Sequence, residues 1–149
     1  MTEGDLRTAT LRWQGTGFDF DATTDGGPVA VRGGGAERTG PSPMELLLVA
    51  AAGCMAIDVV DILTKGRRAP ASYEVEISGV RRASVPRRYT ELRLRHKVGG
   101  ADEASVRRAV DLSQEKYCSV MATLDPEMPI THEIVIVDPA PDQGTATSS

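Results

Sequence analysis

Two cysteines are the side chains of this chain that offer the most chemistry. Cys54 and Cys118 lie 64 residues apart and are the only two cysteines in the 149 residues. A thiolate is a strong nucleophile, and two thiols that meet can cycle between a dithiol and a disulfide. Free cysteine is also among the most buried residue types, so two inert core residues are the plain alternative. Their separation along the chain does not show whether the two sulfurs meet.

Cys54 falls in the clearest helix of the sequence. Residues 42–45 read Ser-Pro-Met-Glu, with an N-cap serine, a first-turn proline and a glutamate that completes a capping box. Residues 46–52 have no polar member, which predicts a helix buried on every side. One sheet of a chain this short covers such a helix poorly. We therefore expect a homodimer with this helix at its centre.

Polar residues enter the same helix only in its second half. At 100° per residue, one stripe carries Cys54, Asp58, Asp61 and Lys65. The stripe predicts a polar cavity around the Cys54 sulfur.

Cys118 lies where a second helix, beginning near Asp102, is expected to stop. The next residue, Ser119, is suited to cap a short third helix. A thiolate near a helix N-terminus is stabilised by the exposed N–H groups and by the helix dipole. This position would favour the thiolate of Cys118, while a packed core cysteine is the simpler interpretation.

The elements around the cysteines come in blocks. Alternating or β-branched segments predict strands at 8–13, 18–22, 29–31, 73–77, 91–98 and 131–137. Helices are predicted at 42–65, 102–118 and 119–124. This order favours an α+β fold with a mainly antiparallel sheet over strict βαβ alternation. Strands 73–77 and 91–98 are expected to form a hairpin in which Glu74 and Glu76 pair with Arg93 and Arg95.

Composition and chain ends set the broad class. An apolar share of 40% and a charged share of 26% are ordinary for a globular protein, and a net charge of −4 gives no global case for nucleic-acid binding. We expect a flexible segment at 1–7, a single domain at 8–138 and a disordered tail at 139–149. The start of the chain lacks the apolar core of a secretory signal, and the apolar run 46–57 is shorter than the roughly 20 residues of a membrane span. A cytoplasmic protein with no membrane partner is expected.

Two segments resemble the cysteine motifs of the OsmC/Ohr family. GPSPMELLLVAAAGCMAIDVVDIL at 40–63 is similar to the first motif, and EKYCSVMATL at 115–124 is similar to the second. The element order agrees from Thr8 to Val137, and the bacterial OsmC-like branch is the best match. The resemblance implies an intertwined homodimer with mainly antiparallel sheets and two main helices, of which the long apolar one is central. It also implies that the two cysteines meet at the subunit interface.

The resemblance further implies a cysteine-based peroxidase that acts on organic or inorganic hydroperoxides in oxidative stress defence. Cys54 would attack the peroxide and become a sulfenic acid, and Cys118 would resolve it as a disulfide. A dithiol reductant, of the lipoyl type in the enzymes, would reopen the disulfide. Neither a metal nor another cofactor is expected.

The sequence departs from the enzymes at two supporting positions. Their catalytic glutamate directly follows the helix-start proline, where this chain has Met44, with Glu45 one residue later. Glu45 precedes Cys54 by nine residues, about 180° around a straight helix, so a capping role explains it better. The first hairpin turn, 14–17, lacks the expected arginine. Arg12, Arg32 and Arg38 remain alternative sources of the activating cation.

These departures keep other functions open. The main alternative is a non-catalytic protein of the same fold that holds a small apolar or thiol-reactive ligand in the dimer cleft. A weaker one is a nucleic-acid accessory using the arginines at 81–82 and 87–88, for which a solvated surface is the simpler interpretation. His96 lies on the apolar face of its strand and is expected to be packed. His96 and His132 have no metal-ligand spacing.

Overall fold

The computed structural model describes residues 4–138. The predictions for residues 1–3 and for the tail at 139–149 fall outside this range, and residues 4–7 belong to no helix or strand. The chain divides into two compact units, Met1–Leu47 and Leu48–Ser149, with the boundary inside its long helix. The single domain expected from residue 8 to residue 138 stays a prediction.

The first unit is a three-stranded antiparallel sheet. Its strands are β1 (Ala9–Trp13), β2 (Asp19–Thr24) and β3 (Gly27–Arg32), in the order β1-β2-β3. The strand β3 starts two residues earlier than predicted because the turn before it is tight. Gly27 takes a φ of 133°, which a side chain would disfavour. All three strands expected from the sequence are therefore present.

The long helix α1 (Pro43–Lys65) begins as its sequence predicts. The Glu45 N–H donates to Ser42 Oγ at 3.2 Å, and the Ser42 N–H donates to Glu45 Oε1 at 2.9 Å. These reciprocal bonds complete the capping box. At the other end, Arg67 adopts a left-handed φ of 61°, and the Arg68 N–H returns to the Leu63 carbonyl at 2.7 Å. That geometry satisfies carbonyls of the last turn.

One side of α1 is buried within the chain and the other side is exposed, as expected if a single chain covers this helix poorly; burial on every side stays a prediction. Val49 and Ile57 remain 65% and 71% exposed. By length and composition alone α1 is also long and apolar enough to cross a membrane, a property shared by core helices of soluble proteins. The whole helix is thus longer and more apolar than the run 46–57 indicated. The buried side consists of Ala51, Ala52, Met55, Val59 and Leu63.

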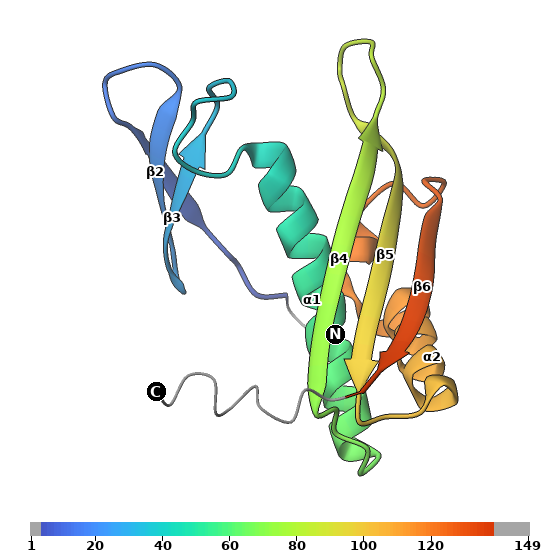
Figure 1. Cartoon of the computed structure of the whole chain (residues 1–149). Coiled ribbons are helices and arrows are strands. Elements are labelled where there is room, and N and C mark those ends of the chain that lie inside the picture. The colour runs from blue at the N-terminus through green and yellow to red at the C-terminus, as the bar shows by residue number, and fades with distance from the viewer. Residues whose placement is uncertain (1–3, 139–149) are drawn as a thin grey trace, which may run out of the picture. The chain divides into compact units, whose positions relative to one another are not determined.

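The second unit contains the sheet β4-β5-β6, formed by β4 (Ser72–Arg81), β5 (Tyr89–Gly99) and β6 (Ile130–Val137). The strands β4 and β5 form the predicted antiparallel hairpin, whereas β5 and β6 run parallel. A parallel pair requires a long crossover. Here it contains α2 (Glu103–Leu112), the π-helix η1 (Ser113–Tyr117) and α3 (Ser119–Thr123). Figure 1 shows α1 and α2 on the same side of this sheet.

The hairpin register confirms the predicted apolar face but changes its ion pairs. Ile77 lies opposite Leu94 as expected. Lys97 lies directly opposite Glu74 and forms salt bridges with both glutamates. Its Nζ is 3.5 Å from a carboxylate oxygen of Glu74 and 2.7 Å from one of Glu76. The strand β6 supplies Glu133, which pairs with Arg95 at 3.3 Å, and Arg93 turns to Glu91 at 2.7 Å. The prediction holds in part: Glu76 lies directly opposite Arg95, whose charge helps to lower the pKa of Glu76, but the salt bridges of both glutamates are formed with Lys97.

A π turn replaces the last part of the predicted second helix. The helix α2 begins next to Asp102, as expected, and Asp102 caps it by accepting from the Ser105 N–H at 2.9 Å. Five residues before Cys118, the Ser113 carbonyl accepts the Cys118 N–H at 2.8 Å, which is the i→i+5 bond of a π-helix. Ser113 is fully buried, but Tyr117 is 52% exposed. Tyr117 comes four residues after Ser113 and would share its face in an α-helix, but the wider turn changes the direction of the residues that follow.

Candidate active site

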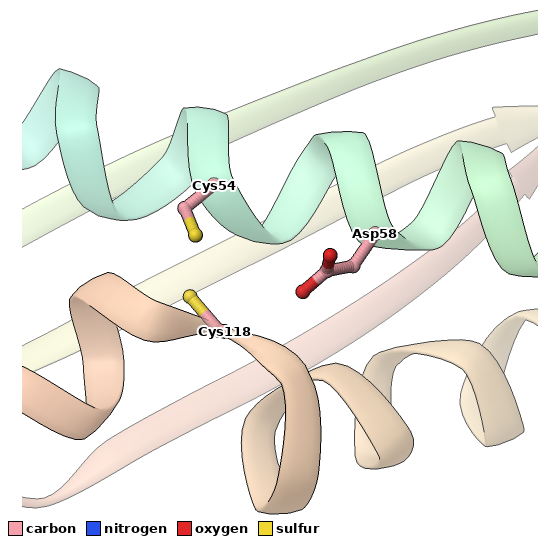
Figure 2. A group of neighbouring side chains, drawn as sticks. All are labelled: Cys54, Asp58 and Cys118. Atoms are coloured by element: carbon pink, nitrogen blue, oxygen red, sulfur yellow. The ribbon is translucent and has the colours of Figure 1, made fainter. Parts of the chain in front are cut away.

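The structure brings Cys54, Asp58 and Cys118 together. Figure 2 shows both sulfurs and the carboxylate directed into the space between α1 and the segment around Cys118. One ligand-type atom from each residue, Sγ or a carboxylate oxygen, lies within 4.8 Å of the other two. Cys54 and Asp58 are four residues apart on α1, so their side chains lie on the same face of the helix. Neither cysteine forms a disulfide.

The π turn explains how the second segment reaches this space. In an α-helix, residues five apart point about 140° away from each other. The wider η1 turn lets Ser113 and Cys118 both face α1. Ser113 Oγ donates to Asp58 Oδ2 at 2.8 Å, which fixes the carboxylate beside the thiols. Ser113 is thus a member of the site that the sequence did not reveal.

Cys118 is a buried thiol that caps its own short helix. Its side chain is at the N-cap of α3, where Sγ accepts from the Met121 N–H at 3.5 Å. The predicted cap, Ser119, is instead the first helical residue. Burial, and to a smaller extent the neighbouring Cys54 thiol, raises the pKa of Cys118 to about 11. The Met121 and Val120 N–H groups at the helix N-terminus lower the pKa, as expected, but burial outweighs them, and the simpler interpretation of Cys118 as a packed cysteine agrees with its burial.

The rest of the polar stripe on α1 points elsewhere. Asp61 is exposed and pairs with Lys65, four residues on, at 2.9 Å. Cys54 and Asp58 are both half-buried. Of the predicted stripe, Cys54 and Asp58 are the members that lie with Cys118, and the polar cavity expected around Cys54 stays a prediction.

Among the alternative cations, two are engaged within the first unit. Arg38 pairs with Glu45, and Arg32 donates to the Phe20 carbonyl at 2.6 Å. The Ser42 backbone N–H, helped by Arg38, lowers the pKa of Glu45. Arg12 lies opposite Asp21 in the sheet and is exposed. The choice among the three arginines stays a prediction.

A second polar cluster lies next to the first and was also missed. Tyr73 Oη lies 2.8 Å from His96 Nδ1, His96 Nε2 lies 3.1 Å from His132 Nδ1, and His132 Nε2 lies 2.9 Å from Gln114 Oε1. The amide oxygen of Gln114 can only accept, so each neutral ring donates through Nε2 and accepts at Nδ1, and the tyrosine hydroxyl donates. We call Tyr73, His96, His132 and Gln114 the histidine chain.

Burial keeps the histidine chain neutral. His96 is completely buried, as its position on the strand predicted. Burial lowers the pKa of His96 to about 4, and the neighbouring His132 acts in the same direction. Burial also lowers the pKa of His132. Both rings are therefore uncharged at neutral pH.

Comparison with known proteins identifies the family. The family model described as OsmC-like protein matches residues 33–133, which is more than half of the chain. The chain belongs to the OsmC-like protein family. Its α+β fold is the one predicted from the sequence.

Relatives of this OsmC-like protein cover almost its whole length. Protein YhfA of Escherichia coli K12 is 43% identical over 131 residues, which span 87% of this chain and 97% of YhfA. A hypothetical protein from Aquifex aeolicus has a crystal structure with 30% identity and a TM-score of 0.78, covering 91% of this chain and 100% of that one. The organic hydroperoxide resistance protein OhrB of Bacillus subtilis shares the fold, with a TM-score of 0.63 at 14% identity and coverages of 89% and 98%.

Proposed function

We propose that this OsmC-like protein is a thiol peroxidase that reduces organic or inorganic hydroperoxides in oxidative stress defence. The observation that carries the proposal is the meeting of Cys54 and Cys118, from segments far apart in sequence, with ligand atoms within 4.8 Å. Cys54 is the attacking residue because it is half-buried, whereas Cys118 is 3% exposed. The shared fold with a hydroperoxide resistance protein supports the same reaction class.

The proposed cycle balances with two thiols and one external dithiol. The Cys54 thiolate attacks one peroxide oxygen, the O–O bond breaks, and the leaving alkoxide takes a proton to become an alcohol. The product at Cys54 is a sulfenic acid. The Cys118 sulfur then attacks the sulfur of Cys54, and the departing hydroxide leaves as water with the Cys118 proton. A lipoyl-type dithiol reduces the resulting disulfide by thiol–disulfide exchange.

We further propose that the working form is a homodimer in the cytoplasm. The exposed apolar residues of α1 support a second copy, since Val49, Ile57 and Val60 are all exposed on one helix. An open hollow along the same helix is lined by Ala56, Ile57, Val60, Asp61 and Thr64. A reducing compartment suits the location because it keeps both thiols free between cycles.

Replacement of the attacking thiol tests the proposal. The Cys54→Ser variant should lose dithiol-dependent consumption of tert-butyl hydroperoxide down to the uncatalysed rate. The Cys118→Ser variant should complete one reduction and then stop with an oxidised Cys54, detected as a sulfenic acid adduct by mass spectrometry. Wild-type turnover in the Cys54→Ser variant would refute the peroxidase.

A non-catalytic ligand-binding protein is the second candidate. It is favoured by the pairing of Glu45 with Ser42 and Arg38 and by the raised pKa of Cys118, neither of which activates a nucleophile. A peroxide rate no greater than that of free cysteine, together with a small molecule that copurifies with the chain, would favour this candidate over the enzyme.

A further inference from the structure

The three side chains of the site are also a set of metal ligands. Two sulfurs and a carboxylate oxygen lie within 4.8 Å of one another. In a tetrahedral zinc site with Zn–S bonds of about 2.3 Å, two sulfurs are separated by about 3.8 Å. The 4.8 Å limit on the separation of the three ligand atoms is about 1 Å above that value. The residues come from one helix turn and from the end of the π turn, so no backbone rearrangement is needed to gather them.

The surroundings of Asp58 suit a metal-bound carboxylate. Ser113 Oγ donates to Asp58 Oδ2 at 2.8 Å. In metal sites, the carboxylates that bind the metal are typically oriented by such hydrogen bonds from neighbouring residues. Among residues 48–138 the described ion pairs do not include Asp58. The carboxylate is thus oriented by a hydrogen bond, while its charge is not balanced by a lysine or arginine salt bridge in that range.

The sulfur of Cys118 also has a partner that suits a thiolate. The Met121 N–H points at Sγ from 3.5 Å. A metal-bound thiolate gains from such a donor, because the hydrogen bond stabilises negative charge on sulfur. The segments α1, η1 and the first turn of α3 therefore supply both the metal ligands and the groups that form hydrogen bonds to those ligands.

We propose that Cys54, Cys118 and Asp58 bind a thiophilic divalent cation of the Zn²⁺ class when both cysteines are reduced. Two thiolates select a borderline-soft metal, and the single carboxylate is a common third ligand of zinc. The fourth position is open to water or a small anion. On binding, the metal forms two bonds to sulfur and one to oxygen, and the two thiol protons are released. No electron is transferred.

This binding activity is separate from peroxide reduction but uses the same sulfurs. A disulfide between the cysteines removes both sulfur ligands, so metal binding is confined to the reduced protein. A bound cation in turn occupies the electron pairs that would attack a peroxide. The site would therefore hold either a metal or a reacting peroxide, and zinc would protect the reduced thiols from oxidation.

Zinc titration of the reduced full-length chain tests the site directly. We expect one Zn²⁺ per chain, measured by competition with a chromophoric chelator, and none after oxidation of the cysteines with diamide. The Asp58→Asn variant should bind more weakly by at least about tenfold, and Ser113→Ala by about tenfold. Asp61→Asn is the matched control, since Asp61 lies on the same stripe but pairs with Lys65 outside the cluster. It should bind as the wild type does.

Cobalt supplies a readout of the ligands themselves. Co²⁺ bound to the reduced wild type should give a sulfur-to-cobalt charge-transfer band, which should be weaker in Cys118→Ser and in Cys54→Ser. Circular dichroism establishes that each variant is folded. Failure of the reduced wild type to bind Zn²⁺, or equal affinity in Asp58→Asn and Asp61→Asn, would overturn the proposal. Neither measurement uses peroxide, so both results are independent of the peroxidase.

Discussion

Two polar clusters meet at one π turn and differ in how their groups are satisfied. We call Cys54, Asp58 and Cys118 the thiol cluster. The Ser113 hydroxyl donates to Asp58 in this cluster, whereas the neighbouring Gln114 contacts His132 at the end of the histidine chain. The histidine chain is a closed series of donors and acceptors. The thiol cluster instead gathers three groups that can each become negative. Hydrogen-bond chains in which every donor and acceptor is satisfied stabilise a fold. Ionisable groups without a partner of opposite charge are typical of functional sites.

Removing a ring from the histidine chain should have the largest effect on stability. We expect His96→Ala to lower the free energy of unfolding by about 3–5 kcal/mol, because it opens a cavity and leaves Tyr73 and His132 without their shared partner. Urea denaturation measures this loss. The matched variant Cys54→Ser, in the thiol cluster, should lose far less stability. Equal losses in the two variants would contradict the division between a structural and a functional cluster.

Acid should destabilise the protein through the same chain. The pKa of His96 is about 4 in the folded state and near 6.5 when unfolded, so between these values the unfolded chain binds more protons. Stability should therefore fall as the pH drops from about 6.5 to 4, by up to about 3 kcal/mol from His96 alone. The lowered pKa of His132 adds to the loss. Urea midpoints across this range should show a smaller slope in His96→Gln; an unchanged slope would exclude His96 as the source.

Ser113→Ala should lower the free energy of unfolding by a moderate amount and should also show how the residue next to Gln114 contributes to the thiol cluster. The variant removes the hydrogen bond that holds Asp58. A lost hydrogen bond to a charged group costs about 1.5–3 kcal/mol when buried, and the half-buried Asp58 should lie at the low end. Urea denaturation gives the loss in stability, and the rate of disulfide formation after one equivalent of peroxide should fall in parallel. A variant that forms the disulfide at the wild-type rate would show that Asp58 needs no fixed position.

The smallest expected effect distinguishes the two thiols from each other. Cys118 is almost fully buried and has a pKa of about 11, so little of it is thiolate at pH 7.5. Iodoacetamide should label Cys54 at least about tenfold faster than Cys118, since the thiolate is the reacting form. Mass spectrometry of peptides after timed labelling measures both rates. Faster labelling of Cys118 would reverse the proposed roles of attacking and resolving cysteine.

Local sequence signals predicted the elements well. The capping box of residues 42–45, the alternation of the strands and the helix start near Asp102 all correspond to bonds in the structure. Each of these features is decided by residues within a few positions of one another, so a single sequence is enough to find it. The family resemblance, and not the spacing, supplied the expectation that Cys54 and Cys118 meet.

Features set by distant partners were missed. The π turn has no strong local signature, so the sequence did not place Ser113 beside Asp58. The glutamates of β4 pair with Lys97 because the parallel strand β6 offers Glu133 to Arg95. The burial of Cys118 reverses the effect expected from its helix position. In each case the deciding neighbour is far away in the sequence.

The parallel pairing of β5 with β6 has a consequence for the order in which the molecule is completed. The strand β6 is the last described element, and it carries His132. A chain emerging from the ribosome can form the β4–β5 hairpin and α2 before this strand exists. Until β6 is made, Gln114 lacks its partner and one side of the π turn is unanchored. The thiols therefore reach their final surroundings only after β6 has been synthesised, when Gln114 can bind His132.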